Sequence, residues 1–291
     1  MSMKWIHNVL KQRIITAIIL ALLFIAATVF LSSFSYSLLV TIVVLAASWE
    51  WCEFIGFGKQ GAKVSYLATL GSTILALYFF LGVAPESLAI NSYRVAIILG
   101  LGTLFWVLTF LMLKDYPSNS DSWNNKSKIA LMGLMALIPT WVGIVQIKYL
   151  NPEGFLLLGM VVMVAAADIG AYFVGKGIGK NKLAPSLSPN KTWEGVWGGL
   201  AACLCVGFLL IWLLHRYLIT LSHEQVLILV LLSLVVTLFD VIGDLLESML
   251  KRNRHLKDSG KILPGHGGIL DRVDGLLAVT PIFVLTFLII E

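Results

Sequence analysis

The sequence predicts an all-α integral membrane protein, a polytopic bundle of about nine transmembrane helices. Its 291 residues are 58% hydrophobic and only 13% charged, whereas an average soluble domain carries about 25% charged residues. Apolar runs of roughly 18 residues or more recur along the whole chain, and each is long enough to cross a hydrocarbon core of about 30 Å. Little of the chain is left for a soluble domain.

The predicted spans are apolar windows separated by polar loops. They cover residues 14–32, 35–56, 64–83, 94–113, 128–148, 154–177, 193–216, 225–250 and 268–290. The first window follows Lys4, Lys11 and Arg13, as in a signal peptide. It is longer than a signal core and lacks a clear cleavage site of small residues, so we expect it to be retained as a span.

The distribution of positive charge predicts the orientation. If the N-terminus is cytoplasmic, all of the 21 Lys and Arg residues except Arg94, Lys148 and Arg216 belong to cytoplasmic segments. Short cytoplasmic loops are enriched in Lys and Arg. One missed or added helix would reverse the side of every later loop, so this bias favours nine spans with the C-terminus outside.

Polar residues divide the chain into two parts. Residues 1–150, with the first five spans, carry few polar side chains apart from Glu50 and Glu53. We expect a scaffold there, with a route for lipid and surfaces for oligomer contacts. Residues 151–291, with the last four spans and their cytoplasmic loops, hold the chemistry. The positive residues form no single soluble basic face, which argues against nucleic acid, and three cysteines in apolar stretches do not indicate disulfides.

Acidic residues gather in the sixth, eighth and ninth spans. Polar side chains recur at three- and four-residue steps in the eighth span and therefore share one helix face: Ser233, Thr237, Asp240, Asp244, Glu247, Ser248 and Lys251. Asp271 and Asp274 open the ninth span, which is antiparallel to the eighth, so both acid sets lie at one depth. Asp168 and Tyr172 approach from the sixth span. Acids inside a membrane are costly and usually functional.

Carboxylates brought together repel one another, so this arrangement favours a bound cation. Oxygen ligands without intramembrane His or Cys at metal spacing favour Mg²⁺. The alternative is that the acids form buried salt bridges with Lys251, Arg252 or Arg272. For Asp240 and Asp274, a ligand and a structural role are equally compatible with the sequence.

Two cytoplasmic loops suit phosphate. Residues 251–274 place five Lys or Arg residues before a glycine-rich stretch that leads straight into a helix. Glycine lets a backbone approach an anion, and the free amides of a helix start attract it. For Lys251, Arg252 and Lys257 we favour this role, whereas for Arg254 and Lys261 we favour contact with anionic lipid head groups.

The second loop, residues 175–194, carries four lysines together with Ser188 and Thr192. It can close over a nucleoside triphosphate, and a solvated cytoplasmic loop is the alternative. It is not a P-loop, because Gly177 stands where Ser or Thr is needed and an apolar helix precedes it. Gly195 and Gly199 form a GxxxG that indicates close helix packing and, weakly, a homodimer.

At these residues the sequence resembles the bacterial CDP-diacylglycerol synthases, or phosphatidate cytidylyltransferases. The family's C-terminal pattern is matched in spacing by Ser248, Lys251, Arg252, Lys257, Asp258, Pro264, His266, Gly267, Gly268, Asp271, Arg272 and Asp274. An upstream stretch also matches: Ala167, Asp168, Gly170, Ala171, Tyr172, Lys182, Leu183, Pro185, Ser188, Pro189, Lys191, Thr192, Glu194 and Gly195. Two positions depart from the pattern, where Ile169 and Asp240 replace small residues that the family carries.

The resemblance implies transfer of CMP from CTP to phosphatidic acid at a cytoplasmic site of the bacterial inner membrane. It implies Mg²⁺ on Asp244 and Asp271, with Asp240 as a further candidate ligand and room for a second cation such as K⁺. Lys251, Arg252 and Arg272 are expected to act with the two metal-binding acids. The expected substrate-binding residues are Asp168, Tyr172, Lys182, Ser188, Lys191, Thr192, Ser248, Lys257, Asp258, His266, Gly267, Gly268 and Asp274.

Two alternatives remain at this point. Another CTP-dependent lipid enzyme, such as a polyprenol kinase or an ether-lipid synthase, would need a broadly similar site. A secondary transporter also carries intramembrane acids, but its site lies near the midplane between inverted repeats. The acids here are expected in the inner third of the membrane, and the sequence shows no repeat, so an enzyme is favoured.

Overall fold

The fold is almost entirely helical. The computed structural model describes residues 3–263, 265 and 267–290, with side chains described from residue 15 onward. The helices are α1 (Met3–Phe30), α2 (Ser33–Ile55), α3 (Gln60–Leu81), α4 (Ser92–Lys114), α5 (Ser120–Trp123), α6 (Lys126–Leu150), α7 (Phe155–Ile178), α8 (Trp193–Tyr217), α9 (His223–Asn253) and α10 (Leu270–Ile290), and the strands are β1 (Lys182–Ala184) and β2 (Ser188–Thr192). The predicted fold class is confirmed.

Eight helices in the described part of the chain are long and apolar enough to cross a membrane. They are α2, α3, α4, α6, α7, α8, α9 and α10, and each coincides with a predicted span to within a few residues. The first predicted span, residues 14–32, falls on α1, whose described apolar part is the shorter stretch Ile15–Phe30. The count of nine and the orientation of the termini stay predictions.

Capping residues explain where several helices begin and end. Asn91, Asn125, Thr192 and Ser222 each accept a hydrogen bond from the backbone N–H three residues later, at the start of α4, α6, α8 and α9. Such a cap satisfies an amide that has no partner within the helix. Gly56 ends α2 in the left-handed region, at φ 76°, which glycine adopts without steric cost.

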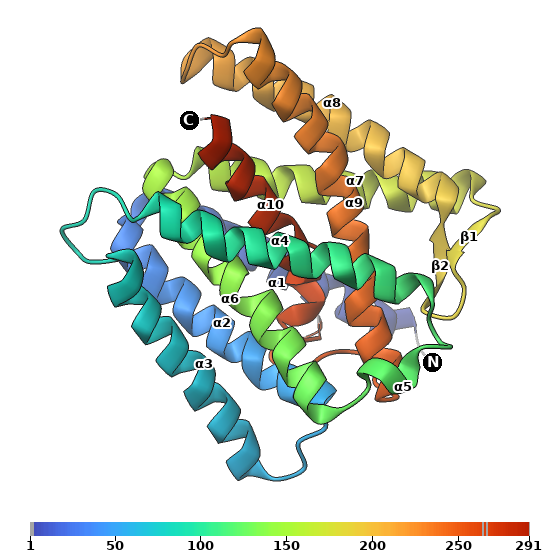
Figure 1. Ribbon diagram of the computed structural model, residues 1–291. Helices are drawn as coiled ribbons and strands as arrows, with labels where there is room; N and C mark the ends of the chain where they lie inside the picture. The colour runs from blue at the N-terminus through green and yellow to red at the C-terminus, as the bar shows by residue number, and fades with distance from the viewer. Residues whose placement is uncertain (1–2, 264, 266, 291) are drawn as a thin grey trace.

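The helices share one core. Figure 1 shows α2, α3 and α6 side by side in one half and α7 beside α8 in the other, with α9 and α10 passing between them. Helix α10 packs on α4 and α6 as well as on α9, and buried apolar side chains form one cluster from Tyr36 to Val284. The first 150 residues therefore contribute to the surroundings of the C-terminal helices.

The segment between α7 and α8 is more ordered than the loop that the sequence predicts. Strands β1 and β2 pair antiparallel, with Lys182 opposite Thr192 and Ala184 opposite Ser188. The GxxxG glycines face α7, because a Cβ at Gly195 would lie 3.0 Å from the carbonyl oxygen of Ala171 and one at Gly199 would lie 2.9 Å from that of Ala167. These glycines serve packing within the chain, so the homodimer stays a prediction without their support.

Candidate functional site

The polar face predicted for α9 is buried inside the helix bundle. Ser233, Thr237, Asp240, Glu247 and Ser248 are all buried. In a span that is otherwise apolar, these side chains need polar partners, because a buried polar group without one is costly. Within α9, Ser233, Glu247 and Ser248 bond to Leu229, Lys251 and Asp244. The charged residues of this face also meet charged side chains of α7, α10 and the β1–β2 hairpin, and the acids form two adjoining groups.

The first group, called here the inner acid cluster, consists of Asp168, Asp240, Asp244 and Asp274 around Lys191. Asp168 comes from α7, Asp240 and Asp244 from α9, Asp274 from α10 and Lys191 from β2. The Lys191 Nζ lies 2.6 Å from Asp244 Oδ2, and the charges of all four acids and the lysine influence one another. The convergence of three helices predicted from spacing is therefore present.

The second group surrounds Asp271 at the start of α10. Its Oδ1 accepts a hydrogen bond of 2.8 Å from Lys251 Nζ. Its Oδ2 accepts three, from the Ser259 amide at 2.9 Å, the Ser259 hydroxyl at 3.0 Å and the Gly268 amide at 2.8 Å. Oδ2 is thus held by hydrogen bonds from the segment between α9 and α10, whereas Oδ1 faces the ammonium group of Lys251.

Lys251 and Glu247 connect the two groups. Lys251 Nζ lies 2.6 Å from Glu247 Oε2 and 2.8 Å from Asp271 Oδ1. The charge of Glu247 interacts with Asp271 on one side and Asp274 on the other, and Asp274 interacts in turn with Asp244. Asp244 and Asp271 therefore pair with different lysines and belong to one continuous row of acids.

The hairpin brings its residues to α9 in two ways. Lys191 pairs with Asp244, and the Arg252 Nε donates to the carbonyl oxygen of Leu187 at 3.3 Å. Thr192 is buried and caps α8 by accepting from the Gly195 amide, which gives it a structural role. Ser188 lies in β2, and Lys182 is exposed in β1.

The remaining predicted site residues lie around these two groups. Tyr172 is 59% exposed, and its hydroxyl accepts from Lys176 at 3.2 Å. Lys257 and Asp258 are exposed on the loop between α9 and α10, and Arg272 is exposed in the first turn of α10. Ser248 donates to Asp244 Oδ1 at 3.1 Å, and Gly267 adopts φ 85° beside Asp271. Pro264 and His266 fall outside the described residues.

Two contributors were not assigned to the site from the sequence alone. Glu247 was expected only as one member of the polar face, yet it pairs with Lys251. Glu50 of α2 reaches the start of α10, where its Oε2 accepts from the Leu270 amide at 2.9 Å and the Ser259 hydroxyl at 3.3 Å. An acid at the inner end of an apolar span was the available signal for Glu50.

The residues present have the chemistry that a hard cation requires. All the charged acceptors are carboxylates, and Glu247 Oε1 is buried without a hydrogen-bond partner in the described structure. Oxygen donors of this kind suit Mg²⁺, which commonly binds one or two carboxylates together with substrate phosphates. Within the described residues, no three His, Cys, Asp or Glu side chains already form a ligand set. A cation bound here would therefore complete its coordination shell with oxygen atoms of a bound substrate, such as phosphate oxygens.

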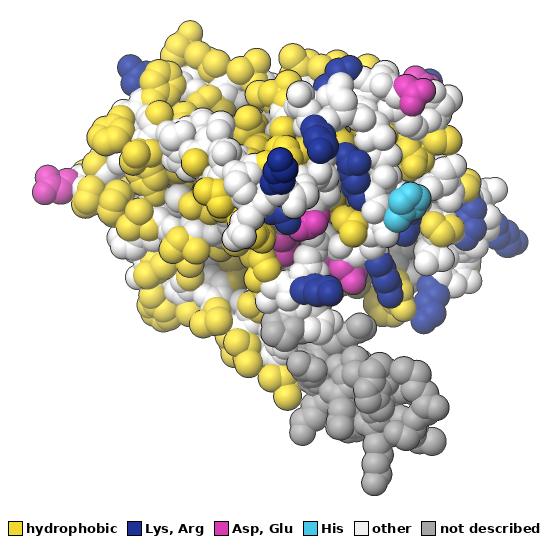
Figure 2. Space-filling view, turned by 90° about the horizontal axis from the view of Figure 1, so that it is seen from below, with side chains coloured by type: hydrophobic (Ala, Val, Ile, Leu, Met, Phe, Trp, Pro, Cys, Tyr) yellow, Lys and Arg dark blue, Asp and Glu magenta, His cyan; other side chains and the backbone are white. Residues whose placement is uncertain are grey.

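Positive residues surround the acids at one end of the molecule. Figure 2 shows dark blue Lys and Arg side chains gathered around a few magenta acids, while yellow apolar side chains cover much of the remaining face. Lys191, Lys251 and Arg252 belong to this end through the contacts described above. A polyphosphate approaching this end would meet cations first.

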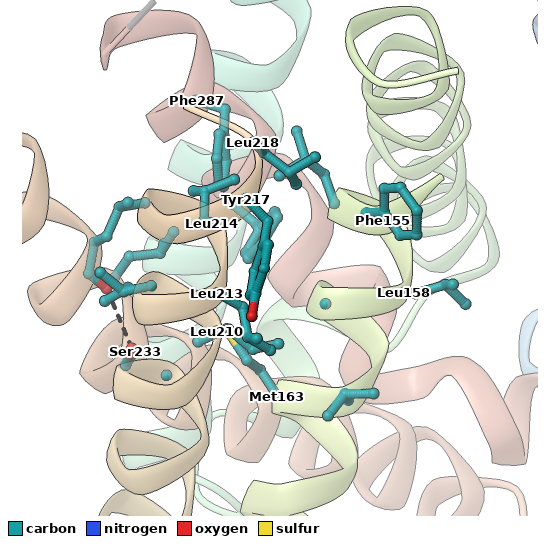
Figure 3. A pocket seen from close by; sticks show the side chains of 18 residues that line it. Phe155, Leu158, Met163, Leu210, Leu213, Leu214, Tyr217, Leu218, Ser233 and Phe287 are labelled. Carbon is teal, nitrogen blue, oxygen red and sulfur yellow. Dashed lines mark hydrogen bonds between the residues drawn. The ribbon is translucent and has the colours of Figure 1, made fainter. Parts of the chain in front are cut away.

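A separate cavity of about 370 Å³ lies at the other end of the same helices, between α7, α8, α9 and α10. Figure 3 shows it between Phe155, Met163, Leu210, Tyr217 and Phe287. Phe155 begins α7 and Tyr217 ends α8, so the cavity lies opposite the hairpin. Its lining is almost entirely apolar, and it lacks the charge needed to bind a triphosphate.

The site depends on close contact between α9 and α10. A Cβ at Gly243 would lie 2.3 Å from the backbone oxygen of Asp274, so we expect Gly243→Ala to push the helices apart and to destabilise the protein by about 1–3 kcal/mol. Gly177→Ala, whose Cβ would meet nothing within 4 Å, is the matched control. Thermal unfolding in detergent measures both, and equal midpoints would contradict this packing.

Comparison with known proteins places the chain. Residues 11–290 match the profile of the Cytidylyltransferase family. The chain belongs to this family. The prediction of a nucleotidyltransferase is therefore confirmed, and the family match includes α2, which supplies Glu50, as well as the C-terminal helices.

Three similar relatives are bacterial family members, each named phosphatidate cytidylyltransferase. The protein of Pseudomonas aeruginosa is 38% identical over 275 residues, which are 94% of this chain and 95% of the relative. That of Haemophilus influenzae is 34% identical over 286 residues, 94% of this chain and 97% of the relative. That of Bacillus subtilis is 32% identical over 282 residues, 94% of this chain and 95% of the relative. The family resemblance at the C-terminal motifs thus extends over nearly the whole chain.

Proposed function

We propose that this chain transfers CMP from CTP to phosphatidic acid, giving CDP-diacylglycerol and pyrophosphate. The supporting observation is similarity over 94% of the chain to three bacterial phosphatidate cytidylyltransferases. The structure adds a row of intramembrane acids and lysines that suits a polyphosphate and a cation. CTP would arrive from the aqueous end that carries these cations, and the lipid would enter sideways between helices.

In this proposal Asp244 and Asp271 would hold Mg²⁺ beside the triphosphate. The Asp271 Oδ2 is fixed by three donors, so Oδ1 would be free to act as the ligand, and Asp244 would use Oδ2. These are the two oxygens that now face lysines. Bound Mg²⁺ would neutralise the triphosphate and polarise its phosphoryl oxygens. Asp240 as a further ligand and a second cation such as K⁺ stay predictions.

The lysines paired with these acids would contact phosphates. Lys191 and Lys251 lie within 2.8 Å of carboxylate oxygens, so a cation placed beside the same oxygens would free their ammonium groups for substrate. Arg252 and Arg272 lie at the same end, where the Gly268 amide donates to Asp271 at 2.8 Å and Gly267 lies beside the same carboxylate. Amides at the start of α10 also favour an anion through the helix dipole.

The reaction needs alignment more than a base. A phosphate oxygen of phosphatidic acid attacks the α-phosphorus of CTP and forms a new P–O bond, and the bond from that phosphorus to the bridging oxygen breaks as pyrophosphate leaves. The attacking oxygen is already anionic, so no proton has to be removed. Positioning of the reactants and neutralisation of charge account for most of the rate acceleration in phosphoryl transfer. These are the roles that the proposal assigns to the lysines and acids.

The same charges support a proposed orientation in the membrane. The basic end would lie in the cytoplasm, where Lys and Arg are enriched, and the apolar cavity would lie toward the outer face. For a bacterial chain this corresponds to the inner membrane with a cytoplasmic active site. Cysteine labelling at residue 261, on the loop between α9 and α10, and at residue 86, between α3 and α4, would test this orientation in intact cells.

The activity is tested by supplying purified protein with phosphatidic acid, Mg²⁺ and one nucleoside triphosphate at a time. Among the nucleoside triphosphates tested, we expect only CTP to react, and to yield pyrophosphate and CDP-diacylglycerol in equal amounts. Release of CDP with a phosphorylated lipid would instead identify a kinase, and preference for an ether-linked acceptor would identify an ether-lipid synthase. Solute flux into proteoliposomes without CTP would identify a transporter. Any of these three outcomes would overturn the proposal.

A further inference from the structure

Glu50 lies where the N-terminal helices meet the proposed catalytic loop. It belongs to α2, is 2% exposed, and is separated by more than 200 positions from the residues that it contacts. Its Oε2 accepts from the Leu270 amide at 2.9 Å, the first backbone N–H of α10, and from the Ser259 hydroxyl at 3.3 Å. A carboxylate from one half of the chain thus caps the helix that carries Asp271.

Ser259 connects Glu50 to Asp271. Its hydroxyl lies 3.3 Å from Glu50 Oε2 and 3.0 Å from Asp271 Oδ2, and its amide donates to the same Asp271 oxygen at 2.9 Å. The hydroxyl has one proton, which the two carboxylates share, and each accepts more strongly than a neutral oxygen would, so Ser259 is held between the two acids. The direction of the Asp271 carboxyl therefore depends on where Glu50 holds Ser259 and the start of α10.

Two glycines leave the space that Glu50 occupies. A Cβ at Gly260 would lie 2.3 Å from Glu50 Oε1, and one at Gly268 would lie 2.5 Å from Glu50 Oε2 and 2.1 Å from the Ser259 Oγ. Any other residue at either position would displace the carboxylate. The close approach of backbone to Glu50 is thus built into the loop on both sides.

A further pair of contacts fixes the same end of α2 to the loop. The Arg254 guanidinium donates to the carbonyl oxygens of Phe54 at 2.7 Å and Ile55 at 3.0 Å, which are the last residues of α2. Helix α2 is therefore bound to the α9–α10 loop at two points, through Arg254 and through Glu50. Arg254 anchors the helix end, whereas only Glu50 contacts the hydrogen-bond chain that reaches Asp271.

We propose that Glu50 is a positioning residue for the cytidylyl transfer, acting through Ser259 and the start of α10 to aim Asp271 Oδ1 at the metal and triphosphate. The inference rests on the proposed role of Asp271. In this proposal Glu50 acts through its hydrogen bonds to Ser259 and the Leu270 amide. Its contribution is to keep one carboxylate of the metal site in a single direction before the substrate arrives, which saves the cost of ordering it during the reaction.

The test compares Glu50→Gln with Glu53→Gln. Glu53 is three residues away on the same helix, but it is more exposed and pairs with Lys63 at 2.5 Å. It therefore lies at the same end of α2 as Glu50 but makes a different contact. For Glu50→Gln we expect kcat to fall ~10-fold, the rate equivalent of one charge-assisted hydrogen bond. We also expect the Mg²⁺ concentration for half-maximal rate to rise ~10-fold, while the KM for phosphatidic acid stays unchanged.

A purely structural role would give a different pattern. It would reduce the yield and the unfolding temperature of Glu50→Gln but leave the Mg²⁺ requirement of the folded fraction unchanged, and that result would overturn the proposal. Ser259→Ala serves as the second variant, because it removes only a hydroxyl. We expect it to raise the Mg²⁺ requirement in the same direction, and the double variant to be less affected than the product of the two single effects.

The outcome can be separated from that of the proposed function. If wild-type protein does not form CDP-diacylglycerol, the proposed function fails. If wild type is active and Asp271→Asn is not, whereas Glu50→Gln and Glu53→Gln have equal kcat and equal Mg²⁺ dependence, the function stands and the role of Glu50 fails. Multiplicative effects of Glu50→Gln and Ser259→Ala would also contradict the proposed chain of contacts.

Discussion

Replacing Asp271 or Asp244 by Asn will lower the rate of CDP-diacylglycerol formation ~1000-fold or more while leaving a folded protein. Asn keeps the size of the side chain and can still accept from the Ser259 and Gly268 amides or from Ser248. It removes the negative charge that the metal needs, and loss of a ligand that stabilises the transition state by about 4 kcal/mol corresponds to this factor. Turnover with saturating CTP and phosphatidic acid measures the effect.

The control for these variants is Asp121→Asn. Asp121 is exposed in the short helix α5 and has no contact with the acid row in the described structure, so its activity should equal that of wild type. Each variant should elute from a sizing column as wild type does. Full activity in both Asp244→Asn and Asp271→Asn would show that neither carboxylate holds a catalytic cation.

Replacing Lys251 by Gln will both inactivate and destabilise the protein. Lys251 contacts Glu247 at 2.6 Å and Asp271 at 2.8 Å, and the side chains of both acids are less than 10% exposed. Breaking a buried ion pair by removing one partner typically costs about 3–5 kcal/mol. We therefore expect a large fall in unfolding temperature together with loss of turnover, measured by thermal unfolding in detergent and by product formation.

Two further variants test whether loss of the buried ion pairs causes the fall in stability. Lys63→Gln breaks the more exposed pair with Glu53, and surface pairs are worth about 0–1 kcal/mol, so its unfolding temperature should barely change. Adding Glu247→Gln to Lys251→Gln removes one uncompensated charge and should restore part of the stability but not the activity. If Lys251→Gln and Lys63→Gln have equal unfolding temperatures, the buried pairing is wrong.

The helices could be predicted because each is encoded locally. Hydropathy over a window of span length places the eight long helices from α2 to α10 to within a few residues but misses the four-residue α5, and caps such as Asn91 and Ser222 explain where two of them start. The β1–β2 hairpin was missed because its strands are short and polar, with no period that separates them from a loop. Its order comes from contacts with α9, through Lys191 and Arg252.

The acid site was predictable only in part, because some of its contacts join segments that are distant in the sequence. Asp240 and Asp244 share a face of α9 by spacing, and the antiparallel connection places Asp274 beside them, so these three members of the inner acid cluster follow from local geometry. Local geometry does not determine which lysine pairs with which acid. Lys251 pairs with Asp271 as the salt-bridge alternative allowed, whereas the pairing of Lys191 with Asp244 depends on the fold of the hairpin.

Glu50 illustrates the limit most clearly. Its contacts with Ser259 and Leu270 span more than 200 positions, and no periodicity within α2 indicates which loop its inner end will meet. The sequence predicts that a buried acid needs partners, but the packing of α2 against α6 and α10 determines them. Contacts between distant helices require the three-dimensional arrangement.

The most direct test of the metal-assisted site is equilibrium binding of CTP to purified protein with and without Mg²⁺. The acids and lysines described here predict that CTP binds at least ~10-fold more tightly with Mg²⁺, and that Asp244→Asn and Asp271→Asn lose this gain. Wild-type affinity for CTP that does not change between Mg²⁺ and a chelator would contradict the site.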